Sequence, residues 1–454
     1  MPDLRRDAKA VYLAIVDAIA ADIQSGRLST ADRLPPQREL AKALDVNYAT
    51  VSRAYGEAQR RGLVYSRVGQ GTFVRKPRPS ARPHSGGGRV DMTMNLPPEP
   101  EDPMLVERLE SGFRRLAGEL RELLRYQEFG GSTEARQAAA SWLARVGLKA
   151  EIERLLVCPG AQSALVATLN SLAKPGDVAL CENLTYPGIR AVAAQLGVRL
   201  IGLPMDEEGI CSAAFAAACE EHRPKVLYCN PTMQNPTTNT ITGARRREIV
   251  RIARQHGLAI IEDDAYGMLP SECPPTFASL APDLTYYVTG FAKCLGAGLR
   301  VAYLLAPDAR QVARLSTILR ATTVMASPMM VALATHWVED GTAEAVLAAI
   351  RVESVQRQKL AAKILHGSSF QAHPEGFHLW LNLPAPWKRA AFASHMRSRD
   401  VHVVVSDAFA VDREPSEAVR VCLGGEPSRS EIKRALEAMA DALQQPVSRE
   451  AAFF

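Results

Sequence analysis

Apolar residues near the start of the chain recur at the spacing of one helical face over residues 11–23. The stretch RELAKAL, which follows two prolines, predicts a short second helix. YATVSRAYGEAQRRG predicts a third helix, which Asn47 is suited to cap. LVYSR and TFVRK are strand-like runs on either side of VGQG, whose glycines favour a turn. The pattern therefore predicts a small unit of three helices followed by a β-hairpin.

Beyond about residue 103 the pattern changes, because short apolar runs alternate with amphipathic helical stretches. Buried strands separated by helices predict an α/β domain with a mostly parallel seven-stranded sheet. In such sheets, ligands bind beyond the carboxyl ends of the strands. The seven runs are RLLVC, VALCEN, VRLIGLP, KVLYC, LAIIED, TYYVTGF and RVAYLLA.

Between these two parts, residues 77–102 are rich in Pro, Gly, Ser and Arg and show no periodicity, which predicts an interdomain linker. The expected domains are residues 1–76 and residues 103–445, with a small C-terminal α+β subdomain over about residues 340–445. A length of 454 residues agrees with two or three domains.

The basic charge of the chain is concentrated at its start. Residues 1–90 contain 16 Lys and Arg against 8 Asp and Glu, a net charge of +8, whereas the whole chain has +5. A solvated surface would explain this excess, but a basic module on a slightly acidic body also suits binding to a phosphate backbone. The outer side of the third predicted helix is small and basic, as entry into a DNA major groove requires. That side carries Ala49, Ser52, Arg53, Gly56 and Arg60.

Composition limits the cellular setting. The longest uncharged run, residues 321–338, contains Thr, Ser, Pro and His and is too polar to span a bilayer. The N-terminus has no apolar signal region, so we expect a cytoplasmic protein with no membrane partner. The eight cysteines include no C-x-x-C pair, which favours reduced thiols, and we expect no metal site.

Chemically reactive residues follow the predicted strands. Lys293 comes directly after TYYVTGF, and the stretch LAIIEDDAYG contains Asp263 and, three residues later, Tyr266. Alone, Lys293 would be interpreted as a surface charge and Asp263 as a helix cap. Together they match an aldehyde cofactor that forms a Schiff base with a lysine. Such a cofactor also needs a carboxylate at its pyridine nitrogen and a donor at its phenolic oxygen.

Further residues at strand ends suit the same cofactor. Asn235, in CNPTMQNPTTNT, offers a second donor for a phenolic oxygen, although a turn asparagine would look the same. CPGAQSAL is a glycine turn that opens a helix, and Arg300 lies near Lys293 in sequence, so both favour a phosphate. Tyr186 supplies a flat ring that can stack on a pyridine.

The N-terminal unit resembles the GntR family of bacterial regulators, through LPPQRELAKAL, VNYATVSRAY and GLVYSRVGQGTFV. The resemblance implies a winged helix-turn-helix that binds double-stranded DNA. A solvated charge at Arg38 and a helix cap at Asn47 are the simpler interpretations. Tyr48 stands where family members often carry a basic residue. The DNA contacts that the resemblance implies are Arg38, Asn47, Tyr48, Thr50, Ser52, Arg53, Gly69 and Thr72.

The second part resembles fold type I pyridoxal-phosphate enzymes of the aspartate aminotransferase family, over roughly residues 103–445. The resemblance makes Lys293 the Schiff-base lysine, and Arg420, in AVRVCLGG, the residue that binds a substrate carboxylate. Tyr126 resembles a tyrosine that reaches the phosphate in the neighbouring subunit, which implies a homodimer. The other implied cofactor contacts are Asp263 at the pyridine nitrogen, Tyr266 and Asn235 at the phenolic oxygen, Tyr186 on the ring, and Gly160, Ala161, Gln162 and Arg300 at the phosphate, with Thr289 as the nearest hydroxyl.

A GntR-like winged helix joined to an aminotransferase-like domain is the architecture of the MocR branch of GntR regulators. We therefore expect a pyridoxal-phosphate-dependent transcriptional regulator in which an amino compound displaces Lys293 to form an external aldimine and changes promoter binding. Two subunits would read paired half-sites. The alternatives are an aminotransferase that uses 2-oxoglutarate or a similar acceptor, and a DNA-binding scaffold without a ligand. Gly290 and Ala292 stand where aminotransferases commonly carry serines, which weakens the expectation of phosphate contacts and turnover.

Overall fold

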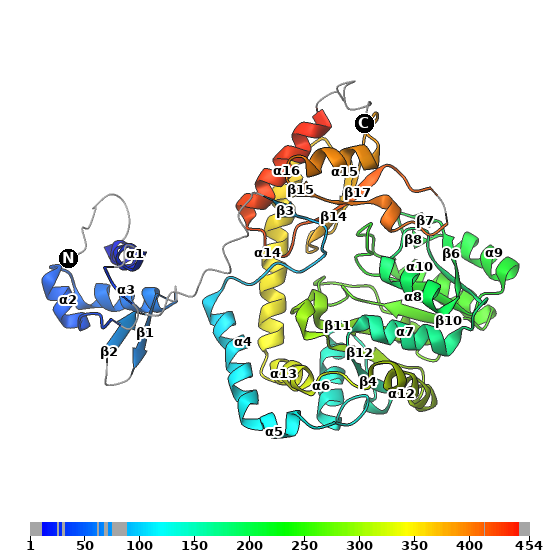
Figure 1. Ribbon diagram of the computed structural model, residues 1–454, viewed down its shortest axis with the longest axis horizontal. Coiled ribbons are helices and arrows are strands. Elements are labelled where there is room, and N and C mark those ends of the chain that lie inside the picture. The colour runs from blue at the N-terminus through cyan, green and yellow to red at the C-terminus, as the bar shows by residue number, and fades with distance from the viewer. Residues whose placement is uncertain are drawn as a thin grey trace. The chain divides into compact units, whose positions relative to one another are not determined.

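The computed structural model describes residues 11–24, 27–29, 32–60, 63–67, 71–74, 89–412 and 414–444. The chain divides into two compact units, each considered by itself: Met1–Gly88 with Glu101–Glu107, and Arg89–Pro100 with Arg108–Phe454. Figure 1 labels most of their helices and strands. Within the described ranges, no helix combines the length and apolar character needed to cross a membrane. The same ranges contain no cluster of three or more His, Cys, Asp or Glu side chains suited to a metal ion.

The N-terminal unit has the three helices and the hairpin that the apolar pattern predicts. Its core forms where buried residues of the first and third helices meet, among them Ile15, Val16 and Val51. The hydroxyl of Tyr55 donates a 2.7 Å hydrogen bond to the Pro35 carbonyl, which ties the third helix to the loop before the second. The elements are α1 (Val11–Gln24), α2 (Gln37–Ala43), α3 (Tyr48–Arg60), and the antiparallel strands β1 (Val64–Arg67) and β2 (Gly71–Val74).

Helix α3 begins where the sequence indicates. The Asn47 side chain accepts a 2.8 Å hydrogen bond from the backbone N–H of Ala49, so Asn47 caps the helix. Val51 and Ala58 are fully buried, whereas Ala49 and Arg53 are exposed. The predicted division of α3 into an apolar inner side and a small, basic outer side is confirmed.

The second unit contains a seven-stranded sheet built from the seven predicted runs. Neighbouring strands are parallel except at β12, which runs antiparallel to both of its neighbours. The mostly parallel sheet expected from the sequence is therefore confirmed. Its strands, in spatial order, are β4 (Leu155–Cys158), β12 (Ala302–Leu305), β11 (Thr285–Gly290), β10 (Ala259–Asp263), β9 (Val226–Cys229), β5 (Val178–Glu182) and β6 (Arg199–Leu203).

Helices cover both faces of this sheet, because alternate strand residues are apolar on both sides. One apolar cluster joins the sheet to α7 (Ala161–Leu172), α8 (Pro187–Leu196) and α12 (Ala309–Thr323). The other joins it to α9 (Ser212–His222), α10 (Gly243–Gln255) and α11 (Phe277–Leu280). With both faces covered, the strand ends are the part of the sheet left to hold a ligand.

A smaller α+β part completes the second unit, as expected. Its four strands form an antiparallel sheet that packs on three helices, and α14 is the long yellow helix of Figure 1. The strands, in spatial order, are β13 (Phe370–Ala372), β14 (His378–Asn382), β17 (Ala418–Cys422) and β16 (Val404–Val405), and the helices are α14 (Thr342–Ile364), α15 (Arg389–Arg397) and α16 (Arg429–Gln444).

Residues 89–98, which we call the strap, pack within the second unit although they lie inside the segment predicted as a linker. Strand β3 (Val90–Asp91) pairs in parallel with β15 (Val401–His402). Val90 and Met92 are buried in the core of the smaller part, since their side chains alternate inward as in a strand. The backbone of Met92 also bonds to the backbones of His402 and Cys422, so the strap is fixed to both β15 and β17.

The remaining elements connect these parts. The helices are α4 (Pro103–Leu116), α5 (Leu120–Leu123), α6 (Thr133–Leu143) and α13 (Pro328–Glu339). A two-stranded hairpin consists of β7 (Met205–Asp206) and β8 (Gly209–Ile210). Short 3-10 turns are η1 (Ala117–Glu119), η2 (Ala144–Val146), η3 (Ile152–Arg154), η4 (Phe291–Lys293), η5 (Ala297–Leu299) and η6 (Ser406–Ala408).

Candidate functional site

A cavity of about 260 Å3 lies at the carboxyl ends of the parallel strands of the large sheet. The antiparallel strand β12 contributes as well, because it begins at this edge, directly after Arg300 and Val301. The strap supplies Met94, Asn95 and Leu96 to the same cavity. Most of the predicted cofactor residues line it together: Gly160, Ala161, Gln162, Tyr186, Asn235, Asp263, Tyr266, Lys293 and Arg300.

Lys293 ends the turn η4, which follows β11 directly. Its Nζ donates a hydrogen bond to the backbone carbonyl of Asn95 in the strap. Burial lowers the pKa of Lys293 to about 8 because a charged ammonium is poorly solvated there. About a tenth of this amine is therefore unprotonated at pH 7, far more than for an ordinary lysine, and the unprotonated form is the nucleophile.

Asp263 is the last residue of β10 and is buried. Its Oδ2 accepts a 2.8 Å hydrogen bond from the Tyr228 hydroxyl, and its backbone carbonyl accepts one of 2.5 Å from the Asn230 amide. Burial raises the pKa of Asp263 to about 6, and the Tyr228 bond opposes this shift. The other carboxyl oxygen, Oδ1, has no partner among the described residues. It can accept a hydrogen bond from a ligand N–H such as a protonated pyridine nitrogen.

Tyr266 and Asn235 bring two further polar groups to the cavity. The Tyr266 hydroxyl accepts a 2.9 Å hydrogen bond from the Asn95 side-chain amide, so its own proton can be donated to a second acceptor. The centre of the Tyr266 ring lies 5.8 Å from Lys293 Nζ. The Asn235 carbonyl oxygen accepts a 2.7 Å hydrogen bond from Arg420, which leaves the amide nitrogen of Asn235 as its donor. Both residues fit the phenolic oxygen of a pyridoxal ring.

Arg420 lies in β17 and is buried, but it is not one of the residues that line the cavity. Besides Asn235, its guanidinium donates a 2.5 Å hydrogen bond to the Thr93 carbonyl of the strap. It also lies 4.9 Å from the centre of the Phe409 ring. Its Nε has no partner among the described residues. A buried guanidinium of this kind suits an anionic ligand group.

The part of the cavity next to α7 suits a phosphate. Gly160 precedes α7 with φ of +86°, and a Cβ there would lie 2.8 Å from the Arg300 guanidinium. Only glycine permits this close approach of the arginine to a helix N-terminus. Gln162 is held by its neighbours, since it donates to the Gly188 carbonyl and accepts from the Tyr186 hydroxyl. Helix N–H groups together with a guanidinium make a favourable anion site. The residues present therefore fit pyridoxal phosphate from its ring to its phosphate.

Two predicted cofactor residues, Thr289 and Tyr126, do not line this cavity. Thr289 is buried and its hydroxyl donates a 3.0 Å hydrogen bond to the Asp264 carbonyl, because alternate residues of β11 face away from the cavity. Tyr126 is 79% exposed and does not line the cavity of its own chain. The contact expected from the sequence is with the phosphate in the neighbouring subunit, and it stays a prediction.

The sequence interpretation missed four polar residues of the site. Thr93 and Asn95 were not predicted because their segment shows no hydrophobic periodicity. Asn230 and Tyr228 bind Asp263 from β9 and the loop after it, and the duplicated Asn-Pro pair in CNPTMQNPT was the available signal for Asn230.

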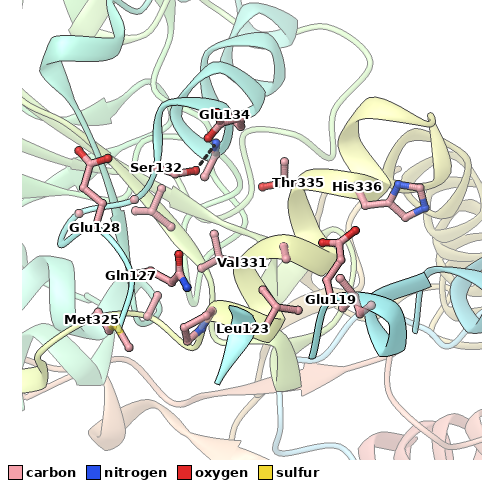
Figure 2. Close-up of a pocket in the computed structure, with 18 of the residues that line it drawn as sticks. Glu119, Leu123, Gln127, Glu128, Ser132, Glu134, Met325, Val331, Thr335 and His336 are labelled. Carbon is pink, nitrogen blue, oxygen red and sulfur yellow. Dashed lines mark hydrogen bonds between the residues drawn. The ribbon is translucent and has the colours of Figure 1, made fainter. Parts of the chain in front are cut away.

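A second cavity, of about 280 Å3, is lined mainly by the chain from the end of α4 to the first turn of α6 and by α13 with the residues just before it (Figure 2). Glu119, Glu128, Glu134 and His336 are among its lining residues, and none of the predicted cofactor residues is. Figure 2 also shows Ser132, which caps α6 by accepting a 3.3 Å hydrogen bond from the Ala135 N–H. The chemistry expected from the sequence therefore belongs to the first cavity.

The proposed DNA contacts lie mainly on the outer side of α2 and α3. Arg38 is exposed, and half of the Tyr48 side-chain surface is exposed at the start of α3. The Arg53 guanidinium lies 4.2 Å from the centre of the Tyr12 ring, which holds it against α1. Thr50, Ser52 and Thr72 are partly buried, and Gly69 lies outside the described residues.

The fold and the cavity define a fold type I pyridoxal-phosphate domain that follows a winged helix-turn-helix in the chain. The chain belongs to the aminotransferase class I and II family, whose model matches residues 90–439. Residues 11–74 match the gntR family of bacterial regulatory proteins. This combination confirms the MocR arrangement expected from the sequence, with a GntR-type DNA-binding domain and an aminotransferase-like domain of the pyridoxal-phosphate class.

Two curated relatives are similar over nearly the whole chain. The uncharacterized HTH-type transcriptional regulator YdeF of Bacillus subtilis is 29% identical over 441 residues, 96% of this chain and 95% of the relative. The HTH-type transcriptional regulator TauR of Rhodobacter capsulatus is 26% identical and covers 86% of this chain and 88% of its own length.

Solved structures share the fold of the second unit. An archaeal alanine:glyoxylate aminotransferase superposes with a TM-score of 0.72 at 23% identity, over 79% of this chain and 91% of that one. The α-aminoadipate aminotransferase LysN of Thermus thermophilus, in complex with N-(5'-phosphopyridoxyl)-L-leucine, superposes with a TM-score of 0.71 at 24% identity, over 79% and 92%.

Proposed function

We propose that this protein is a pyridoxal-phosphate-dependent transcriptional regulator that senses an amino compound at Lys293 and thereby changes its affinity for promoter DNA. It would act in the cytoplasm, where its DNA is accessible. The observation that carries the proposal is the position of the strap. The strap follows the DNA-binding unit in sequence, and it bonds to Lys293 through Asn95 and to Arg420 through Thr93.

Several polar groups of the cavity, and Arg420 beside it, have a defined part in this function. Bound pyridoxal phosphate supplies an electrophilic carbon to which amines add. Lys293 supplies the amine that holds it, and Asp263 Oδ1 accepts a hydrogen bond from the pyridine nitrogen. Arg300 and the first N–H groups of α7 bind the phosphate. Arg420 binds the anionic end of the amino compound.

The strap explains how occupancy of the site would reach the DNA-binding unit. An anionic ligand group at Arg420 competes with the Thr93 carbonyl for the same guanidinium, and an amine that replaces Lys293 on the cofactor would release its Nζ as a free amine whose N–H groups can bond to the Asn95 carbonyl. Both carbonyls belong to the strap, so ligand binding favours a different strap arrangement. A coupling of about 1–3 kcal/mol between the two sites would change DNA affinity roughly 5- to 150-fold.

We further propose that the protein acts as a homodimer, in which Tyr126 reaches the phosphate site of the partner subunit. Tyr126 and Leu124 are largely exposed apolar residues in the segment after α5, and Phe113 of α4 is half exposed. Exposed apolar side chains in one region are typical of a subunit interface. Two winged helices held in one dimer would read two half-sites separated by whole helical turns of DNA.

The test uses the full chain loaded with cofactor and a duplex that the full chain itself selects from a random-sequence library. The dissociation constant of the protein–duplex complex is measured with and without amino acids, 4-aminobutyrate and 2-aminoethanesulfonate. We expect at least one amine to change the affinity of the wild type 5-fold or more, and Lys293→Ala to abolish this response. Lys149→Ala removes an exposed lysine distant in sequence and is the matched control. An unchanged response in Lys293→Ala would contradict sensing at this residue.

An aminotransferase that releases a keto acid is the second candidate function. The family match and the presence of Lys293, Asp263 and Arg420 around one site favour it. Steady turnover of an amine with 2-oxoglutarate, at rates of about 1–1000 per second, would support the enzyme. A single conversion that stops after the first half-reaction would support the sensor.

A further inference from the structure

Asn95 lines the cavity and carries a buried side-chain acceptor that no described residue satisfies. The residue is only 6% exposed and lines the cavity from the strap. Its side-chain amide donates to the Tyr266 hydroxyl, and its backbone carbonyl accepts from Lys293. Its side-chain carbonyl Oδ1 is buried and has no hydrogen-bond partner among the described residues. Buried acceptors are nearly always satisfied, so this oxygen needs a hydrogen-bond donor that the described residues do not supply.

The three polar groups of Asn95 have different hydrogen-bond partners. The backbone carbonyl already faces Lys293 Nζ, which marks the place of the reacting amine. The side-chain amide donates a hydrogen bond to the Tyr266 hydroxyl. The side-chain carbonyl therefore addresses a further donor, distinct from the reacting amine and from the anionic group that suits Arg420.

We propose that Asn95 determines specificity by accepting a hydrogen bond, through Oδ1, from a hydroxyl or amide N–H of the amino compound. The preferred ligand class then has three features: an amine, an anionic end, and an O–H or N–H donor elsewhere. This inference rests on the proposed sensing function. A site with a buried acceptor discriminates strongly against analogues without the donor, because the acceptor is then left unpaired.

Because Asn95 belongs to the strap, the O–H or N–H donor of the ligand also affects the arrangement of the strap. Asn95 and Thr93 lie two residues apart on the strap, so the third ligand feature is recognised by the same segment that bonds to Arg420. A ligand that satisfies Oδ1 stabilises one arrangement of the strap. A ligand that lacks the donor occupies the site without this stabilisation.

The test compares ligands that differ by one hydroxyl: L-serine with L-alanine, L-homoserine with L-2-aminobutyrate, and 4-amino-3-hydroxybutyrate with 4-aminobutyrate. Their affinities for the cofactor-loaded full chain are measured from the change in visible absorption. Wild type is expected to bind the hydroxylated member of at least one pair 10-fold or more tightly than its partner. Asn95→Leu is expected to remove this preference.

Asn95→Asp separates the two side-chain roles, because aspartate keeps an acceptor but lacks the amide that donates to Tyr266. It is expected to retain the preference to within about 3-fold, and normal cofactor loading verifies that each variant folds. Equal loss in Asn95→Leu and Asn95→Asp would overturn the inference and leave only positioning of Tyr266. A preference that Asn95→Leu preserves would also overturn it. A loaded wild type that responds to no amine would contradict the proposed sensing function itself, whereas the two preceding results contradict only the role of Asn95.

Discussion

The guanidinium of Arg420 donates a 2.7 Å hydrogen bond to the side-chain carbonyl of Asn235, across 185 residues of sequence. The bond joins β17 of the smaller part to the loop after β9 of the large sheet. It therefore sets the orientation of two groups with different partners, an arginine suited to an anionic ligand and an amide suited to a phenolic oxygen. Binding of an anion at Arg420 and the donor position of Asn235 are linked through this single contact.

Arg420→Lys is expected to weaken the binding of amino carboxylates about 10- to 100-fold. Hydrogen bonds to charged groups contribute about 1.5–3 kcal/mol, and an ammonium does not reproduce the fork of a guanidinium. The measurement is the visible absorption change of the loaded protein during titration with each amino acid. Propylamine, which has no carboxylate, is the control ligand and should bind both proteins equally. Equal weakening for both ligands would show that Arg420 acts on the cofactor rather than on the anion.

Gly160→Ala is expected to lower the affinity for pyridoxal phosphate by 10-fold or more. The new Cβ would lie 2.8 Å from the Arg300 guanidinium and would displace it from the N-terminus of α7. Gly147→Ala is the matched control, because Gly147 has φ of +76° but no atom within 4 Å of the added Cβ. Both variants should lose stability from backbone strain, by about 1–3 kcal/mol, and thermal unfolding measures this. If cofactor affinity fell equally in both, the contact with Arg300 would not be responsible.

The rate of cofactor loading is expected to rise with pH and to level off above about pH 8. Burial lowers the pKa of Lys293 to about 8, and only the unprotonated amine attacks an aldehyde. The contribution of Lys293 to the free energy of unfolding is also expected to rise with pH. Between about pH 8 and the ordinary lysine value near 10.5, the unfolded chain binds a proton that the native apoprotein does not, so this group's contribution to stability rises with pH. Stopped-flow loading from pH 6 to 10 provides the measurement, and a rate that falls across this range would contradict it.

Arg38→Ala is expected to weaken binding to the selected duplex. It is also expected to lower the slope of log Kd against the logarithm of the salt concentration by about one. An arginine that contacts a phosphate releases about one counterion on binding. Lys42→Ala removes another exposed positive charge from the same helix and is the control. Titrations at several salt concentrations distinguish a direct contact from general attraction. An equal effect of the two substitutions would favour general attraction.

The parts of the site that the sequence predicts share a simple origin. Asp263, Lys293 and Asn235 follow buried apolar runs, and the ends of parallel strands meet at one edge of a sheet. The chain pattern therefore places them together without any knowledge of tertiary contacts. The outer side of α3 is predictable for a similar reason, because helical periodicity assigns each residue to a side.

The strap was not predictable in this way. Asn95 contacts Tyr266 across 171 residues, and no local pattern in DMTMNLPPEPEDP indicates such a partner. Proline and glycine near residue 90 favour a linker, whereas burial of Val90 and Met92 against the smaller sheet outweighs that composition. Thr289 shows the converse, since its position in sequence suggested a cofactor contact and the alternation of β11 turns it toward Asp264.

The most direct test of the account is the visible absorption of the full chain after loading with pyridoxal phosphate, followed by borohydride reduction and peptide mapping. We expect an absorption band that shifts when an effective amine is added, and a reduced adduct on Lys293 in the absence of amine. A protein that stays colourless after loading, or an adduct found only on other lysines, would contradict the account.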